Sequence, residues 1–215
     1  FKASAVIKGL GPVSTSKGTK GVMFHTTLLL NGETGETLGV SSQQPWVRPA
    51  TPARKGESGE DRKKRRRESE VWARETKALC GLLRADHAEP PQVVSVMDRE
   101  GDIYEVLHRL RAAGSGFVIR AVHNRKLAVK VGESEYSLDA VMQAPSLGEL
   151  AISVPRKGNQ KEREARLTVR VVDVVLAPPK NLARKGDPFP VRLVVAREEA
   201  EGVPETQRLC WFLLT

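Results

Sequence analysis

The stretch VVSVMDREGDIYEVL, from Val93 to Leu107, decides the fold because two different periodicities meet in it. Val93 to Met97 is a short continuous apolar run, which predicts a strand buried on both faces of a sheet. The run stops at Asp98, and residues 103, 106, 107 and 110 then place apolar side chains at helical spacing. A strand followed at once by an amphipathic helix is therefore expected.

The next residues complete a strand–helix–strand unit. Gly114 and Gly116 are expected to end the helix, because glycine adopts the backbone conformation that follows a helix terminus. Phe117 to Val122, FVIRAV, reads as a second strand. Strand, helix and strand in this length predict a parallel βαβ unit, and hence an α/β fold.

The sequence before this unit predicts a hairpin, a polar connection and a helix. Val22 to Leu30 and Thr37 to Val40 are rich in β-formers and flank the glycine-rich turn NGETGE. Arg48 to Glu68 is polar and basic, as a connection between elements would be. Glu70 to Ala85 follows with helical periodicity. The helical face is expected to carry Trp72, Thr76, Leu79 and Leu83, with Leu82 beside them.

The sequence after Val122 changes character. ELAISVPRKGNQKEREARLTVRVVDVVLAPP alternates apolar and polar residues around the turn KGNQ, and FPVRLVVAR and RLCWFLLT continue in the same way. These runs predict long antiparallel strands, and no second βαβ unit is evident. A β-rich insertion or appended subdomain is expected from residue 123 to residue 215.

Composition limits the classes of function. The 215 residues are 40% hydrophobic and carry a formal charge of +9. The basic balance favours a polyanionic partner, with nucleic acid ahead of an anionic membrane. Cys80 and Cys210 lie in apolar stretches, so two buried reduced thiols are expected rather than a disulfide or zinc site. The basic run Lys63 to Arg67 fits either phosphate binding or a solvated segment.

The position of Asp98 needs a chemical explanation. Ligand groups of α/β sheets gather at the carboxyl ends of the strands, and Asp98 lies at such an end. A carboxylate there is costly without a positive partner, and Mg²⁺ prefers oxygen ligands of this kind. The alternative is that Asp98 caps the following helix, although Asp102 is closer to that helix. Glu100 and Asp102 are expected to pair with Arg99 or face the helix dipole.

Six blocks, in this order, are similar to those of one family: GVMFHTTLLL (21–30), QQPWVRP (43–49), ESEVW (68–72), DREGDIYE (98–105), FVIRAVHNRK (117–126) and WFLLT (211–215). The chain thereby resembles the bacterial insertion-sequence DDE transposases of the IS-four family, over nearly its whole length. The resemblance implies an RNase H-like catalytic core, partial here over residues 1–122, with a mostly antiparallel β insertion subdomain over residues 123–215 that leads back toward the core.

The same resemblance implies an activity and its partners. The family cuts DNA at transposon ends and joins them to a target, with two Mg²⁺ ions, or Mn²⁺ as a substitute, activating water and then a DNA 3′-hydroxyl. The expected partners are double-stranded DNA, as terminal repeats and target, and a second copy in an active homodimer, without a membrane. The expected location is the bacterial cytoplasm, at the nucleoid.

Individual residues carry over from the family pattern. Asp98 matches the second catalytic acid and would bind metal. Trp211 matches a tryptophan on which a flipped base stacks, and a core tryptophan is the alternative. Arg120 matches an arginine near the DNA hairpin, while Arg125 and Lys126 would either contact backbone phosphate or remain solvated. His25 and His123 are expected to be structural rather than metal ligands.

Two parts of the family pattern do not occur in this sequence. The first acid belongs to an Asp-Thr-Thr-like block expected before Phe1. The final Glu belongs to a helix with a Tyr, Arg, Glu and Lys signature, expected after WFLLT. We therefore expect an internal piece of a longer transposase, lacking cleavage and strand-transfer activity by itself.

Two other classes of function fit part of the sequence. The first is another Mg²⁺-dependent phosphotransfer enzyme of the doubly wound type, which also places an aspartate after a buried strand. That class requires further βαβ units, and its phosphatases usually carry a second aspartate where this chain has Glu100. The second is a non-catalytic basic DNA-binding module, which leaves the position of Asp98 unexplained.

Overall fold

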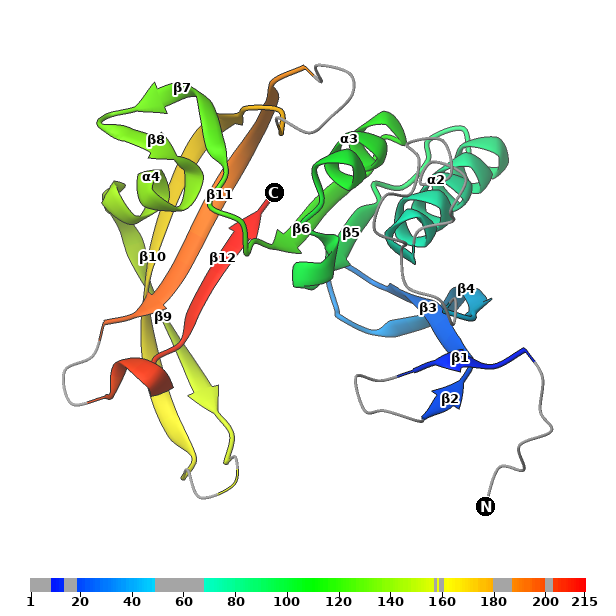
Figure 1. Cartoon of the computed structure of the whole chain (residues 1–215), viewed down its shortest axis with the longest axis horizontal. Helices are drawn as coiled ribbons and strands as arrows, with labels where there is room; N and C mark the ends of the chain where they lie inside the picture. The colour runs from blue at the N-terminus through cyan, green and yellow to red at the C-terminus, as the bar shows by residue number, and fades with distance from the viewer. Residues whose placement is uncertain are drawn as a thin grey trace, which may run out of the picture. The chain divides into compact units, whose positions relative to one another are not determined.

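A computed structural model describes residues 9–13, 19–48, 68–156, 158, 161–179, 187–199 and 203–215 (Figure 1). The chain forms two compact units, Phe1–Leu83 and Arg84–Thr215. The predicted basic run Lys63 to Arg67 lies outside the described residues. Within the described residues, no helix is both long enough and apolar enough to cross a membrane.

The first unit is built on the predicted hairpin. β3 (Met23–Leu30) pairs antiparallel with β4 (Thr37–Trp46), and a two-residue pair, β1 (Gly11–Pro12) with β2 (Lys20–Gly21), accompanies it. The Asn31 side chain stabilises the turn, since its Oδ1 accepts hydrogen bonds from the backbone N–H of Glu33 at 2.9 Å and of Thr34 at 3.1 Å. The hairpin prediction is confirmed.

The predicted helix at Glu70 is α2 (Glu68–Asp86), which begins in the first unit. Its most buried residues are Val71, Ala73, Thr76 and Cys80. Leu82 is 63% exposed, so the expectation that it lies beside the covered face is wrong. The buried face of α2 thus consists of Val71 and small side chains rather than of the larger leucines.

The βαβ prediction is confirmed in the second unit. β5 (Val94–Met97) pairs parallel with β6 (Gly116–Arg120), and α3 (Tyr104–Ala112) connects them after a short 3₁₀ turn, η1 (Arg99–Gly101). Leu107 and Leu110 are fully buried, as the helical spacing predicts. Gly114 follows the helix with φ +73°, a left-handed conformation that glycine adopts without strain.

Burial of β5 differs from the prediction. Val94 is 48% exposed and Val96 is 76% exposed, so this strand is not buried on both faces. β5 is the end strand of its sheet and pairs with β6 alone among the described strands. A continuous apolar run shows that a strand could be buried on both faces, but among the described residues nothing covers the face of β5 that carries Val94 and Val96.

The remainder of the second unit is the β-rich part that the sequence predicts. Its strands are β7 (Lys126–Val131), β8 (Ser134–Tyr136), β9 (Ser146–Val154), β10 (Arg163–Leu176), β11 (Phe189–Glu198) and β12 (Cys210–Leu214). A 3₁₀ turn, η2 (Glu205–Gln207), precedes β12. The sequence did not predict α4 (Ser137–Gln143), whose seven residues are too few for a clear helical period.

The strands join into one mixed sheet of order β5-β6-β12-β11-β10-β7-β8, with β9 paired to β10. Apart from the β5–β6 pair, the strands of this sheet pair antiparallel among the described residues. The chain is thus an α/β protein with a mostly antiparallel mixed sheet, whereas the RNase H-like core stays a prediction. Because β12 pairs with both β11 and β6, the sheet runs without interruption across the predicted boundary at residue 122.

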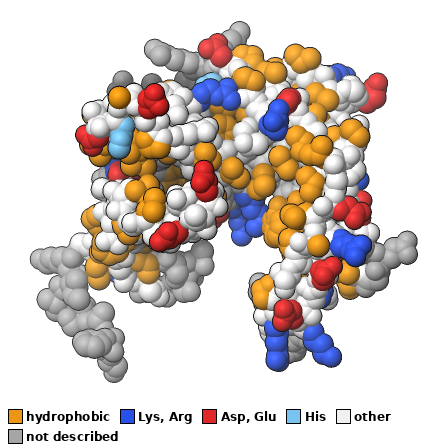
Figure 2. Space-filling model, turned by 180° about the vertical axis from the view of Figure 1, so that it is seen from behind, with side chains coloured by type: hydrophobic (Ala, Val, Ile, Leu, Met, Phe, Trp, Pro, Cys, Tyr) orange, Lys and Arg blue, Asp and Glu red, His pale blue; other side chains and the backbone are white. Residues whose placement is uncertain are grey.

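The two faces of this sheet differ. One face carries Ile119, Leu193 and Leu214, all at most 2% exposed, together with the side chains that α3 packs against. The other face, here called the open face, carries Val94, Val96, Val118, Trp211 and Leu213, which are half-buried or exposed. Figure 2 shows apolar side chains gathered across the lobe that contains β9 to β12.

Candidate functional site

Asp98 directly follows β5, and its backbone is extended, with φ −75° and ψ −170°. Its Oδ1 accepts a hydrogen bond from the backbone N–H of Glu100 at 2.9 Å, and Asp98 is the N-cap of η1. The capping alternative is therefore confirmed for this short turn. The side chain is exposed, and no other described residue donates a hydrogen bond to it. One oxygen thus holds the turn while the other faces solvent.

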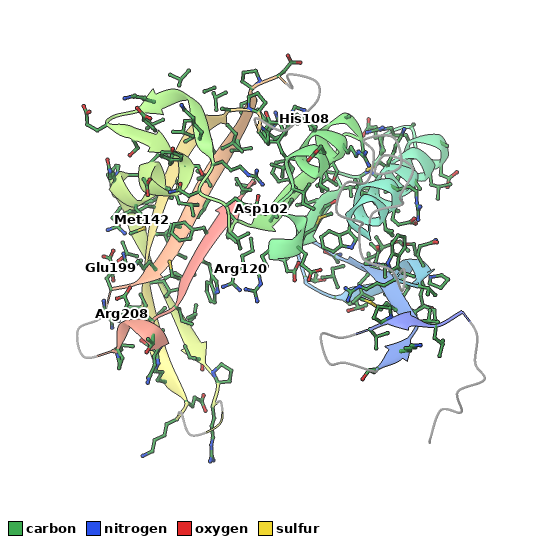
Figure 3. All side chains as sticks on the ribbon, in the orientation of Figure 1. Asp102, His108, Arg120, Met142, Glu199 and Arg208 are labelled. Carbon is green, nitrogen blue, oxygen red and sulfur yellow. The ribbon has the colours of Figure 1, made fainter. Side chains whose placement is uncertain are left out.

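Arg120 leaves the sheet at the same edge as Asp98. In the parallel β5–β6 pair Met97 lies opposite Ile119, so the next residues of the two strands, Asp98 and Arg120, follow at the same level. Alternation along extended backbone puts both side chains on the open face. In Figure 3 the Arg120 side chain projects from the end of β6 on the side away from α3.

Trp211 lies on this same open face. β12 pairs with β6 through Leu213 opposite Arg120, and Trp211 is two residues away along β12. The indole is half-buried and packs beside the buried residues Ala165, Leu167 and Ala196. Both alternatives for Trp211 thus have a structural basis, since it packs on a core cluster and still exposes part of its ring.

Asp102 has a role that its sequence position did not indicate. α3 begins after Ile103 without a side-chain cap, so Asp102 does not cap this helix although it is closer to it than Asp98. Asp102 is 1% exposed, and its Oδ2 accepts the backbone N–H groups of Val122 at 2.8 Å and His123 at 3.0 Å. Its Oδ1 accepts from Arg125, so its ionic partner is Arg125 rather than Arg99.

The same contacts place Arg125, which the sequence assigns to DNA. Its Nη2 donates to Asp102 Oδ1 at 2.5 Å and to the Asp102 carbonyl at 2.7 Å, and its Nε donates to Oδ1 at 3.2 Å. The guanidinium group is 13% exposed. Arg125 is thus committed mainly to holding its own loop, and a phosphate contact by it stays a prediction.

The other residues singled out by the sequence lie in different surroundings. Lys126 begins β7 with an exposed side chain, as a phosphate-contacting or solvated lysine would. His123 uses its backbone N–H to hold Asp102. His25 Nδ1 accepts a hydrogen bond from Trp72 Nε1 at 3.1 Å in the first unit, a structural contact of the kind that the sequence predicts for it.

The thiol of Cys210, next to Trp211 in β12, and the acidic side chains limit which ligands this part of the sheet can bind. Burial raises the pKa of the Cys210 thiol, and Arg197 opposes this effect, so the group stays protonated at neutral pH. The described residues contain no group of three histidine, cysteine or acidic side chains able to surround a metal ion. The exposed Asp98 oxygen suits a hard cation as a single ligand, and a two-ion site requires more acids than these residues supply.

Three of the residues singled out by the sequence share the open face: Asp98, Arg120 and Trp211. A carboxylate can bind a cation, a guanidinium can donate hydrogen bonds to an anion, and a partly exposed indole can stack on a planar ring. A search with protein-family models found no family that matches this chain.

Sequence reasoning missed Asp102 as an organising residue. Its partner Arg125 is 23 positions away, and only the fold brings the two together. The available signal was the pattern Asp-x-x-x-Asp at the strand end, which reads equally well as two caps or two ligands. The buried pair of Glu198 and Arg163 was missed for the same reason, since its members are 35 positions apart.

Proposed function

We propose that this chain is the central part of a bacterial DDE transposase of the IS-four family, acting on DNA at transposon ends. The support from sequence is the order of the six blocks, which span nearly the whole chain. The single observation that carries the proposal is the shared open face of Asp98, Arg120 and Trp211, on adjoining strands of one sheet edge.

Each of these residues has a distinct task in that proposal. The Asp98 carboxylate holds Mg²⁺, which when bound lowers the pKa of water and offsets the negative charge of the phosphate. The Arg120 guanidinium donates hydrogen bonds to a backbone phosphate beside that carboxylate. The Trp211 ring offers a surface for an unstacked base, because every base has a π-face.

The rival classes fit the structure less well. A doubly wound phosphotransfer enzyme needs several parallel strands, and among the described strands only β5 and β6 are parallel. A non-catalytic DNA-binding module accounts for the charge of +9 and for Arg120. It gives no reason for an exposed carboxylate beside that arginine, where it would repel phosphate.

The test uses Asp98→Asn in the longer transposase to which the proposal assigns this chain. Asparagine keeps the cap to the Glu100 N–H and removes the negative charge, so the turn should fold as before. We expect cleavage of transposon-end DNA to fall by at least about 100-fold, with an unchanged dissociation constant for DNA.

Glu100→Gln is the matched control, since it removes a neighbouring exposed carboxylate from the same turn. Cleavage by this variant should stay within about twofold of wild type. Full cleavage by Asp98→Asn would refute the proposal. Loss of cleavage in both variants would show that total charge matters rather than a metal ligand at Asp98.

A further inference from the structure

The turn after Asp98 is held tightly against the sheet. A Cβ atom added to Gly101 would lie 2.7 Å from the Met97 Cβ and 3.0 Å from its Sδ, so the turn packs on the last residue of β5. Met97 in turn pairs with Ile119 of β6. The η1 turn is therefore fixed to β5, and β5 is fixed to β6.

Asp102 closes this chain of contacts from the other side. Its carboxylate accepts the backbone N–H groups of Val122 and His123, in the loop that follows β6. Arg125 satisfies the other carboxylate oxygen. Met97, Gly101, Asp102, the Val122–His123 backbone and Ile119 thus form a closed set of contacts, here called the contact ring.

Asp98 and Arg120 both belong to segments that the contact ring fixes. Asp98 lies between Met97 and Gly101, and Arg120 lies between Ile119 and Val122. Both side chains are exposed, so neighbouring side chains do little to fix their positions. The backbone on both sides of each residue is held instead, and the Asp102 carboxylate joins the two segments beyond the ends of the strands.

We propose that Asp102 is a positioning residue, which sets the spacing of Asp98 and Arg120 by tying the Asp98 turn to the loop after β6. This inference rests on the proposed function, in which Arg120 contacts DNA. Asp102 itself is not a ligand, because both of its oxygens are occupied and only 1% of its surface is exposed.

If Asp102 had a purely structural role, its loss would affect Arg120 no more than the loss of another buried carboxylate that pairs with an arginine. Glu198 provides that comparison. Glu198 is also 1% exposed, pairs with an arginine and accepts a backbone N–H, from Leu209 at 3.1 Å. It lies four residues along β11 from Val194, the residue level with Leu213 and Arg120, or about 13 Å along the strand. Its loss should loosen the fold without changing Arg120.

The experiment is a double-mutant cycle on the DNA affinity of the 215-residue chain, without added metal. Calorimetric titration with one short DNA duplex measures the effect of Arg120→Ala in three backgrounds: wild type, Asp102→Asn and Glu198→Gln. We expect Arg120→Ala to weaken binding about tenfold in the wild-type and Glu198→Gln backgrounds. In Asp102→Asn the same change should cost about threefold or less, because Arg120 is no longer positioned.

Each outcome decides something. Equal Arg120 penalties in all three backgrounds overturn the inference and leave the proposed function standing. A penalty that shrinks equally in Asp102→Asn and Glu198→Gln indicates general loosening and also overturns it. No DNA binding by the wild-type chain would count against the proposed function itself, and the inference would fall with it. If Asp102→Asn does not fold, Arg125→Lys replaces it in the cycle, because lysine keeps the positive charge and removes the paired Nε and Nη2 hydrogen bonds that hold Asp102 Oδ1.

Discussion

Among the described residues of the second unit, Asp102 and Glu198 are buried carboxylates that each pair with an arginine, and the two pairs hold different kinds of structure. Asp102 and Arg125 join the turn after one strand to the loop after its neighbour, where no sheet hydrogen bonds are available. Glu198 and Arg163 join strands and a loop within the antiparallel part, where β9, β10 and β11 already pair over many residues. The same chemistry thus joins a turn and a loop in one place and reinforces a sheet in the other.

The arginines of the two pairs also differ in their contact with water. The Arg125 side chain is 13% exposed, whereas that of Arg163 is 29% exposed. An arginine that loses its carboxylate is less costly where water can reach it. Loss of the carboxylate should therefore lower stability more at the Asp102–Arg125 pair than at the Glu198–Arg163 pair.

The largest effect is expected from Asp102→Ala. It leaves Arg125 and the N–H groups of Val122 and His123 without their buried acceptor. The free energy of unfolding of the second unit should fall by about 3–5 kcal/mol, measured by urea denaturation. A loss below about 1 kcal/mol would mean that water replaces the carboxylate and that the contact ring is not closed.

Glu198→Ala should have a smaller effect, of about 2 kcal/mol, because Arg163 can regain water and the surrounding strands stay paired. The same denaturation experiment measures it. A loss equal to that of Asp102→Ala would remove the distinction between the two pairs.

The Glu198 pair can also be tested through the dependence of stability on pH. The hydrogen bond from Arg163 holds the pKa of Glu198 below its ordinary value of 4.5, and burial opposes this effect. A lowered folded-state pKa stabilises the fold above the unfolded-state pKa, and this contribution is lost as pH falls through the folded-state pKa. Glu198→Gln should therefore flatten the decline in stability below about pH 4.5.

The control for this pH measurement is Glu199→Gln. The hydrogen bond from Arg170 likewise lowers the pKa of Glu199, but this side chain is 42% exposed. The change in slope should be smaller there, since solvent screens the interaction. A steeper decline in Glu198→Gln than in wild type would contradict the assigned direction of the pKa shift.

The smallest effect is expected at the exposed end strand. Val96→Thr changes a side chain that is 76% exposed, so stability should change by less than about 0.5 kcal/mol. Val195→Thr makes the same replacement at a fully buried position of β11 and should cost about 1–3 kcal/mol. Similar losses at both positions would show that β5 is covered in solution.

The sequence predicted the local elements better than their surroundings. The βαβ unit, the first hairpin and the antiparallel strands follow from periodicity and turn residues, which are local properties. The exposure of Val94 and Val96 depends on whether another element packs on that face of the sheet, and no local pattern contains that information. The pairing of Asp102 with Arg125 likewise needs the loop after β6 to return to the η1 turn.

The candidate site was predicted in part. Asp98 was identified from its place at a strand end, where the structure has it exposed and capping η1. No local pattern predicts that Arg120 and Trp211 share its face, because that depends on the register of β12 against β6. The metal and DNA roles of these residues stay predictions.

The position of Trp211 has a practical consequence. The chain has three tryptophans, and Trp46 and Trp72 belong to the first unit, which leaves Trp211 as the only indole of the second. Phenylalanine at both other positions would make the emission spectrum report on the β-sheet edge alone. Quenching of that light by an added oligonucleotide would then reveal an approaching base without any attached dye.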